Sequence, residues 1–319
     1  MVILGGMTRL THSGLSIVEW QPIMGALPPL NEAQWLETFA KYQQTPEYRS
    51  VNAGMTVAGF KGIFWLEYFH RLLGRFIGLV FLLPFLYFLA RKQITRPLLP
   101  KLLLLFGLGA AQGLLGWLMV KSGLVDVPRV SPYRLTAHLG LAVLIYGATL
   151  WIALDLLRPA AQNPPAPRLR RFGLVVTALI FLMILTGGFV AGTRAGFAFN
   201  DWPFMHGQLV PEGLFALTPW WVNAFENIAT VQFNHRLLAY LLCLVIPFYW
   251  WRARRYNLNA GTSKLFDLLL TMLVLQVLLG IGTLYYVVPI ALAAAHQAGA
   301  MLLFILALLI NHRLRVVAA

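Results

Sequence analysis

The sequence is poor in charged residues, which make up 11% of its 319 positions, whereas hydrophobic residues make up 59%. A globular domain with so little charge and so many long apolar runs would not stay dispersed in water, so this composition excludes a soluble protein. The chain also has a single cysteine, Cys243, which excludes an internal disulfide framework and a thiolate metal site. We therefore expect an integral membrane protein.

Acidic residues are scarce as well, because 11 Asp and Glu face 25 Lys and Arg for a net charge of +14. The basic residues stand at the ends of apolar runs, where they are typical of membrane orientation, so no nucleic-acid partner is expected. A membrane barrel would need short alternating strands, whereas the apolar runs here are continuous. The expected fold is therefore all-α, with the lipid bilayer as its surroundings.

Seven apolar stretches are long enough to cross the hydrocarbon core of about 30 Å, which takes about 20 helical residues. Basic residues gather in the connections after positions 90, 157 and 251 and at the end of the chain, and the positive-inside rule places these segments in the cytoplasm. In an external segment, Asn31 followed by Gln34 predicts the start of a surface helix whose Trp35, Leu36 and Phe39 rest on the membrane, on a site or on the protein itself. The seven spans are expected near 63–90, 98–120, 132–157, 172–191, 228–251, 265–287 and 289–310.

An internal repeat organises the chain, because four matches occur in the same order. They are GGMTRLTHSGLSIVEW with GGFVAGTRAGFAFNDW, HRLLGR with HRLLAY, QGLLGWL with QVLLGIG, and TAHLGLAVLIY with AAHQAGAMLLF. The repeat predicts two tandem four-helix bundle halves related by a pseudo-two-fold axis along the membrane normal. We expect residues 1–160 to form the first half, 161–171 a cytoplasmic linker and 172–313 the second half. The first helix of the first half would begin before Met1, so we expect most of it to be missing, with about 10–20 apolar residues encoded upstream.

Four histidines fall inside the predicted membrane helices, six to eight residues from the outer end of each span. At about 1.5 Å per residue, this spacing places them roughly 9–12 Å below the outer surface. Hydrogen bonding between helices would explain one such histidine, but ionisable residues inside membranes are rare and usually functional. Paired imidazoles from facing helices are typical ligands for both faces of a haem iron, whereas zinc would need further ligands and only Glu67 is near. The four are His70, His138, His235 and His296, and we interpret His12, His206 and His312 as ordinary loop and tail residues.

Glu67 distinguishes the two halves. It stands three residues before His70, so both side chains leave one face of the helix, and its counterpart in the second half is Gln232, which does not titrate. A carboxyl beside a haem edge can donate or accept a proton. We therefore expect chemistry in the first half, with Glu67 as the catalytic residue, and a permanent haem that relays electrons in the second half.

Three arginines near the histidines, Arg71, Arg75 and Arg236, are candidates for contacts with haem propionates. Snorkelling of these long side chains to the interface explains them equally well. Gln112 and Gln276 are expected to brace helices by hydrogen bonds rather than to touch a cofactor.

Four stretches carry a family resemblance: GGMTRLTHSGLSIVEW, NAGMTVAGFKGIFWLEYFHRLLGR, AGFAFNDWPFMHG and FNHRLLAY. Together they resemble haem A synthase in the form found in proteobacteria and mitochondria, and the resemblance covers nearly the whole chain. It implies an eight-helix membrane oxidoreductase of two four-helix halves. Such an enzyme oxidises the C8 methyl of haem O to the formyl of haem A, the cofactor of terminal oxidases, by successive hydroxylations and loss of water from a gem-diol.

The resemblance also implies roles for particular residues. His70 and His138 would ligate the iron of the substrate haem O, His235 and His296 would ligate haem b, and Glu67 would be needed for oxidation. Expected partners are the haem O synthase that supplies the substrate, the assembly machinery of cytochrome c oxidase, and an electron donor that is a ferredoxin or a quinol. Some bacterial members carry cysteine pairs in external loops, and this chain does not.

Short cytoplasmic loops without an Arg/Ser-rich presequence favour the bacterial plasma membrane over the mitochondrial inner membrane, with the haem sites toward the extracytoplasmic side. A dihaem b-type electron carrier linked to quinol is the main alternative. It accounts for the four histidines equally well but leaves Glu67 without a purpose. A transporter would predict helix-breaking motifs near the midplane, and the histidines cluster near the outer face instead.

Overall fold

The computed structural model describes residues 1–21, 24–125, 128–157 and 166–315. Within these residues the chain forms helices and loops, and the one strand-like pairing is an isolated bridge between Met205 and Gln208. Seven of the described helices are long and apolar enough to cross a membrane, which confirms the predicted all-α multi-pass membrane protein. They are α4 (Val57–Ala90), α5 (Leu99–Gly123), α6 (Pro132–Leu157), α7 (Pro167–Thr193), α9 (Ile228–Ala253), α10 (Ala260–Tyr285) and α11 (Ile290–Arg313).

Side-chain caps explain where several helices begin. Thr56, Asn227 and Asn259 each accept a hydrogen bond from the backbone N–H three residues further on. Such a cap satisfies a donor that would have no partner inside the helix. Because Thr56 caps α4, this helix begins six residues before the predicted start at position 63. The two additional turns do not face lipid alone but pack against a surface helix.

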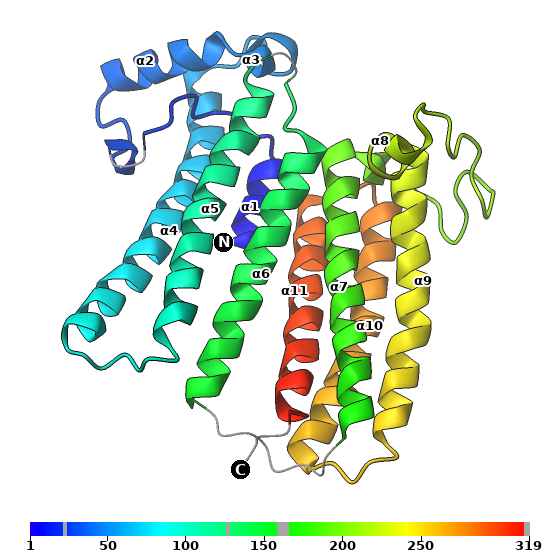
Figure 1. Ribbon diagram of the computed structural model, residues 1–319. Helices are drawn as coiled ribbons and strands as arrows, with labels where there is room; N and C mark the ends of the chain where they lie inside the picture. The colour runs from blue at the N-terminus through cyan, green and yellow to red at the C-terminus, as the bar shows by residue number, and fades with distance from the viewer. Residues whose placement is uncertain (22–23, 126–127, 158–165, 316–319) are drawn as a thin grey trace. The chain divides into compact units, whose positions relative to one another are not determined.

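The contacts within the chain group into two compact units, Met1–Ala142 and Val143–Ala319. In the first unit, α4 packs against the short helix α1 (Val2–Leu10), against α5 and against the surface helix α2 (Glu32–Gln43) (Figure 1). The short segments η1 (Met24–Ala26) and α3 (Pro46–Ser50) lie in the same connection between α1 and α4 as the surface helix.

The surface helix α2 begins as predicted. The side chain of Asn31 accepts a hydrogen bond from the N–H of Gln34 at 2.9 Å. On the face turned toward α4, the rings of Trp35 and Phe64 lie 4.9 Å apart between centroids, and those of Phe39 and Phe60 lie 5.2 Å apart. All four side chains are buried, so for Trp35 and Phe39 the structure supports the option in which the helix rests on the protein, whereas Leu36 is half-exposed and does not take part.

The second unit contains a four-helix bundle. Helix α7 packs against α9 and α11, and α10 packs against the same two helices, which closes the ring (Figure 1). Ile180, Ile246 and Leu269 from three of these helices are almost fully buried between them. The connection between α7 and α9 contains the bridge between Met205 and Gln208 and three short turns of helix, η2 (Ala195–Phe197), η3 (Trp220–Val222) and α8 (Asn223–Glu226).

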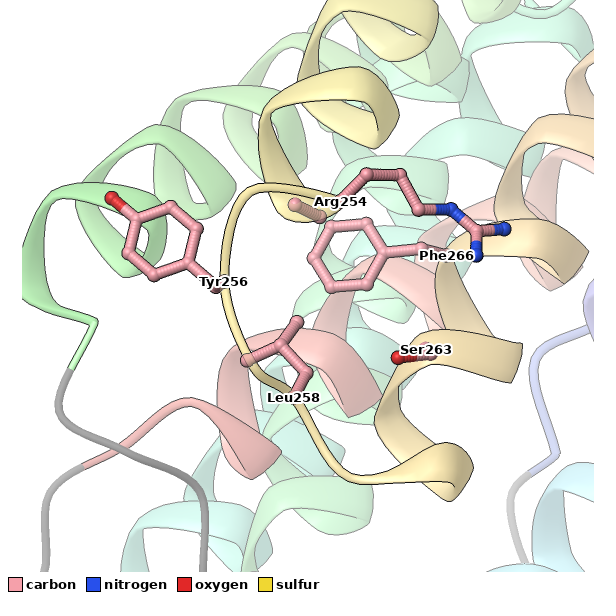
Figure 2. Close-up of a pocket in the computed structure, with 6 residues that line it drawn as sticks. Arg254, Tyr256, Leu258, Ser263 and Phe266 are labelled. Atoms are coloured by element: carbon pink, nitrogen blue, oxygen red, sulfur yellow. The ribbon is translucent and has the colours of Figure 1, made fainter.

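A small cavity of about 140 Å³ lies at the far end of α9, where the chain turns into α10 (Figure 2). Eighteen helical residues separate Ala253 at its edge from His235, which corresponds to about 27 Å along the helix. This cavity is therefore too far from the histidines to belong to a site that they form. Its lining residues are Ala253, Arg254, Tyr256, Leu258, Ser263 and Phe266.

The boundary between the two units falls inside α6. The predicted division placed all of this helix in a first half that ends at position 160. Residues 158–165, which include part of the predicted linker 161–171, lie outside the described residues. The predicted halves 1–160 and 172–313 therefore stay a prediction.

Candidate haem sites

In the first unit, the imidazoles of His70 on α4 and His138 on α6 lie close enough to interact electrostatically. Each imidazole packs on a glycine of a neighbouring helix. A Cβ atom added at Gly5 would lie 2.9 Å from Cε1 of His70, and one added at Gly116 would lie 3.0 Å from Cε1 of His138. Because any side chain there would collide with the ring, glycine is what allows each imidazole to lie on the backbone of the next helix.

The second unit repeats this arrangement. His235 on α9 interacts electrostatically with His296 on α11. A Cβ atom at Gly280 would lie 2.9 Å from Cε1 of His296, and one at Gly187 would lie 3.4 Å from Cε1 of His235. In the sequence repeat, these two glycines correspond to Gly116 and Gly5. The same helices therefore present the same contacts in both units.

Two glutamines brace the helices that carry the second histidine of each pair. Nε2 of Gln112 donates to the carbonyl of His138 at 3.0 Å, and Nε2 of Gln276 donates to the carbonyl of His296 at 2.8 Å. The bonds fix each histidine backbone against the preceding membrane helix, in agreement with the predicted bracing role.

The ring nitrogens of the paired histidines make few hydrogen bonds in the part of the chain that the structure describes, and Nε2 of His138 makes a long one of 3.4 Å with Nε2 of Gln112. Within the described residues, Nδ1 of His70, His138 and His296 is buried without a hydrogen-bond partner, although buried polar groups are nearly always bonded. The same part of the chain contains no cluster of three or more His, Cys, Asp or Glu able to hold a bare metal ion. Two imidazoles would suit a metal whose other ligands come with it, as they do in haem.

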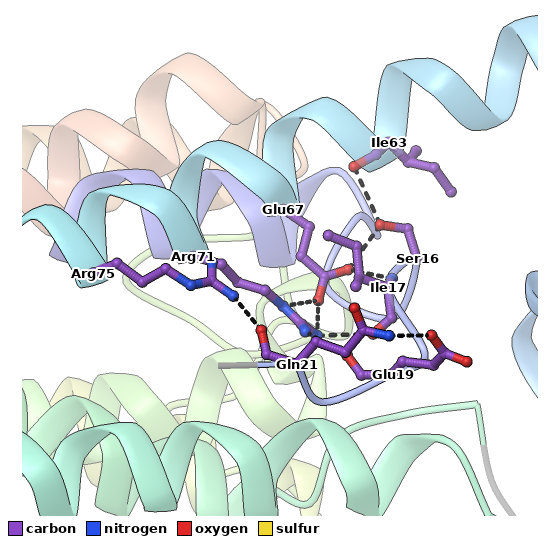
Figure 3. Close-up of polar contacts among 8 residues, drawn as sticks. All are labelled: Ser16, Ile17, Glu19, Gln21, Ile63, Glu67, Arg71 and Arg75. Carbon is purple, nitrogen blue, oxygen red and sulfur yellow. Dashed lines mark hydrogen bonds and ion pairs between the residues drawn. The ribbon is translucent and has the colours of Figure 1, made fainter. Parts of the chain in front are cut away.

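Glu67 is 2% exposed and accepts four hydrogen bonds (Figure 3). Oε2 accepts from the hydroxyl of Ser16 at 2.7 Å and from the N–H of Ile17 at 2.9 Å. Oε1 accepts from Nε and Nη2 of Arg71 at 3.0 and 2.6 Å. The carboxylate is therefore fully paired, and its negative charge is balanced by a guanidinium one turn further along α4.

The arginines of the first unit hold an outer segment, residues 13–21, against α4. Arg71 donates to the carbonyls of Ile17 at 2.8 Å and Glu19 at 3.2 Å, and Arg75 donates to that of Gln21 at 2.9 Å (Figure 3). Glu67, Arg71 and Arg75, which are spaced four residues apart on α4, thus all contact this first outer segment.

The second unit has a matching set of contacts with its own outer segment, residues 195–204. Arg236 donates to the carbonyls of Phe199 at 2.9 Å and Asp201 at 3.0 Å, which correspond in the repeat to Ile17 and Glu19. The next contact is weaker, because the hydroxyl of Tyr240 lies 3.5 Å from the carbonyl of Pro203.

The hydrogen bond that joins Glu67 to the first outer segment and the corresponding bond of Gln232 run in opposite directions. Glu67 accepts from the N–H of Ile17, whereas Gln232 donates through Nε2 to the carbonyl of Phe199 at 2.9 Å. The Ser16 hydroxyl has no counterpart either, because the corresponding residue is Ala198. The exchange of Glu for Gln thus accompanies a change in the surrounding donors.

Sequence reasoning placed the four histidines and Glu67, and the structure brings them together as two pairs with a paired carboxylate beside the first. Sequence reasoning did not single out Ser16 or the glycines that contact the imidazoles, although these glycines all fall in the repeated motifs. They are Gly5, Gly116, Gly187 and Gly280. His312 is not the tail residue that we expected: it is 2% exposed in the last turn of α11, and its Nε2 lies 3.1 Å from Oδ1 of Asp155.

Comparisons with known proteins agree with this arrangement. A family model described as "Cytochrome oxidase assembly protein" matches residues 1–308. A protein named "Heme A synthase" from Nitrosospira multiformis is 57% identical over 318 residues, which cover 99% of this chain and 89% of that protein. Proteins of the same name from Nitrosomonas eutropha and Parvibaculum lavamentivorans are 53% and 50% identical over 98% of this chain, and cover 89% and 90% of those proteins. The chain belongs to this family of cytochrome oxidase assembly proteins, together with the heme A synthases.

Proposed function

We propose that this chain is a haem A synthase, a membrane oxidoreductase that converts the C8 methyl group of haem O into the formyl group of haem A. The observation that carries the proposal is the pairing of His70 with His138 beside Glu67, in a chain about half identical to proteins named for this activity. Haem O is the substrate of the first unit, held through its iron by these two imidazoles.

The residues around the substrate divide the work between binding and proton movement. Each hydroxylation of the methyl carbon requires proton movement at the reacting centre, and Glu67 is the group assigned to donate or accept these protons. Ser16 is bonded directly to Oε2 of this carboxylate, so a proton on one oxygen has a partner 2.7 Å away. Arg71 balances the carboxylate charge and is itself anchored on two backbone carbonyls, which keeps Glu67 in one orientation.

The second unit is assigned to a resident haem b, held by His235 and His296. When bound, haem b supplies a one-electron relay for the oxidation. Gln232 occupies the position of Glu67 and donates to a backbone carbonyl instead of accepting a proton. This replacement fits a site that keeps its haem and performs no chemistry on it.

The arginines contribute mainly to the outer segments. Arg71 and Arg236 each bond two or more backbone carbonyls, so the propionates of a haem would be secondary partners of these guanidinium groups. Contacts of Arg71, Arg75 and Arg236 with propionates stay part of the proposal.

The location follows from the helices and the relatives. Seven apolar helices in a protein with bacterial relatives favour the plasma membrane, and the positive loops favour haem sites toward its extracytoplasmic side. Haem O synthase as the supplier of substrate, the cytochrome c oxidase assembly machinery, and a ferredoxin or quinol as electron donor are the proposed partners.

Four single replacements test the assignment of the two sites. The purified protein and its His70→Ala, His138→Ala, His235→Ala and His296→Ala variants are examined by reduced-minus-oxidised spectra, and their haems are extracted and separated by chromatography. We expect the first two variants to lose haem O and haem A but keep haem b, and the last two to lose haem b. Equal loss of one haem type in all four would contradict the assignment.

The same experiment separates the enzyme from a dihaem electron carrier. A carrier would yield haem b alone, even from cells that accumulate haem O. The relatives named for haem A synthesis favour the enzyme.

A further inference from the structure

Among the four paired histidines, His235 differs in the hydrogen bonding of Nδ1, whereas the ring contact of His138 is at Nε2, 3.4 Å from Nε2 of Gln112. The hydroxyl of Thr186 on α7 lies 2.9 Å from Nδ1 of His235. In the described residues, Nδ1 of His70, His138 and His296 has no such partner. The repeat places Leu4 at the position of Thr186, since both lie one residue before the glycine that supports the imidazole. The first unit therefore cannot form this bond.

Counting protons assigns the direction of the bond. Thr186 Oγ1 also lies 2.9 Å from the carbonyl oxygen of Met183, and a carbonyl can only accept. The single hydroxyl proton therefore goes to Met183, and Oγ1 accepts a proton from Nδ1–H of His235. The imidazole is then fixed in the tautomer whose Nε2 has a free lone pair, which is the form that binds iron.

A threonine hydroxyl bonded to a preceding carbonyl of its own helix is common, so that contact alone means little. Thr177, Thr193 and Thr283 make the same kind of bond, each to the carbonyl four residues before it. None of the bonds described for these three reaches an imidazole. The contact of Thr186 with Nδ1 is what distinguishes it.

We propose that Thr186 is a positioning residue that makes the second site retain its haem, whereas the first site, with Leu4 in its place, binds a haem that it can release. The proposal rests on the proposed function, because a synthase must give up its product while its relay haem stays. A partner on the distal imidazole nitrogen orients the ligand and raises its basicity, and losing one typically weakens metal binding by about 10–100-fold.

Haem b retention in the purified, full-length protein tests this proposal without reference to activity. Thr186→Val removes the hydroxyl at nearly constant volume, Thr186→Ser keeps it, and Thr283→Val removes a hydroxyl of the same unit that bonds only its own helix. Transfer of haem b to apomyoglobin gives the rate of loss, and a redox titration gives the potential. We expect Thr186→Val to lose haem b about 10–100-fold faster and at a raised potential, with Thr186→Ser and Thr283→Val close to the unmodified protein.

The outcomes separate this inference from the function on which it rests. If His235→Ala loses haem b but Thr186→Val keeps both rate and potential unchanged, the role of Thr186 is refuted while the site assignment stands. If His235→Ala keeps haem b, the site assignment itself fails. Should Thr186→Val not accumulate, Leu4→Thr provides the reciprocal test: slower release of haem from the first site supports the proposal, and unchanged release contradicts it.

Discussion

Replacing Glu67 by Gln would make the first unit copy the second, and the structure gives the size of the expected effect. The carboxylate accepts four hydrogen bonds, two of them from Arg71. An amide keeps one acceptor oxygen and turns its NH₂ group toward donors, so about half of these bonds are lost. Hydrogen bonds to charged groups contribute about 1.5–3 kcal/mol each, and removing one partner of a buried ion pair costs about 3–5 kcal/mol.

Two features reduce the loss of stability. The Arg71 side chain is 16% exposed and keeps its bonds to the carbonyls of Ile17 and Glu19, so its charge is not stranded. The new amide can also donate to a carbonyl, as Gln232 does to Phe199. We therefore expect the free energy of unfolding to fall by about 3 kcal/mol, at the lower end of both estimates.

The effect on chemistry should be larger. Loss of a general acid or base typically slows a reaction by about 10²–10⁴-fold, so haem A formed per mole of protein should fall by that factor. Haem O and haem A are extracted and separated by chromatography, and the haem b spectrum reports whether the second site is intact. Glu19→Gln is the matched control, because this carboxyl is about half-exposed in the same outer segment. Undiminished haem A in Glu67→Gln, with haem b intact, would remove Glu67 from the mechanism.

Two further predictions follow from contacts at the sites. Gly280→Ala should lower haem b content more than Gly187→Ala. The new Cβ would lie 2.9 Å from Cε1 of His296 in the first variant and 3.4 Å from Cε1 of His235 in the second, and overpacking costs about 1–3 kcal/mol. Equal haem b spectra in the two variants would contradict this. Ser16→Ala, which copies Ala198, should lower haem A formation and shift its pH profile, because the hydroxyl bonded to Glu67 is lost. Ser13→Ala should leave both unchanged, since the buried Ser13 bonds Thr11 instead, and an identical response of the two serine variants would exclude a specific role for Ser16.

The membrane helices could be predicted because the cost of placing unpaired backbone in lipid leaves few alternatives to long apolar helices. All seven spans were found, whereas the start of α4 was misplaced by six residues. The additional turns carry Phe60 and the cap Thr56, and the sequence between 57 and 62 is too mixed in polarity to be assigned as membrane helix. Their position depends on packing against α2, which hydropathy alone does not report.

The site was predictable in its ligands but not in their supports. Histidines and a glutamate inside apolar helices stand out because ionisable residues there are rare. Thr186 and Ser16 do not stand out, because single hydroxyls are common in membrane helices and usually bond their own backbone. His312 was misassigned for a related reason: a histidine close to the chain end gives no sign that it pairs with Asp155, 157 residues earlier.

The contacts of Arg71 and Arg75 make the position of residues 17–21 depend on the spacing of side chains along α4. Arg71 meets the carbonyls of residues 17 and 19, and Arg75, four residues and about 6 Å further along α4, meets that of residue 21. Inserting or deleting one residue within 17–21 would turn the following carbonyls away from α4, so this stretch should tolerate substitution far better than a change in length.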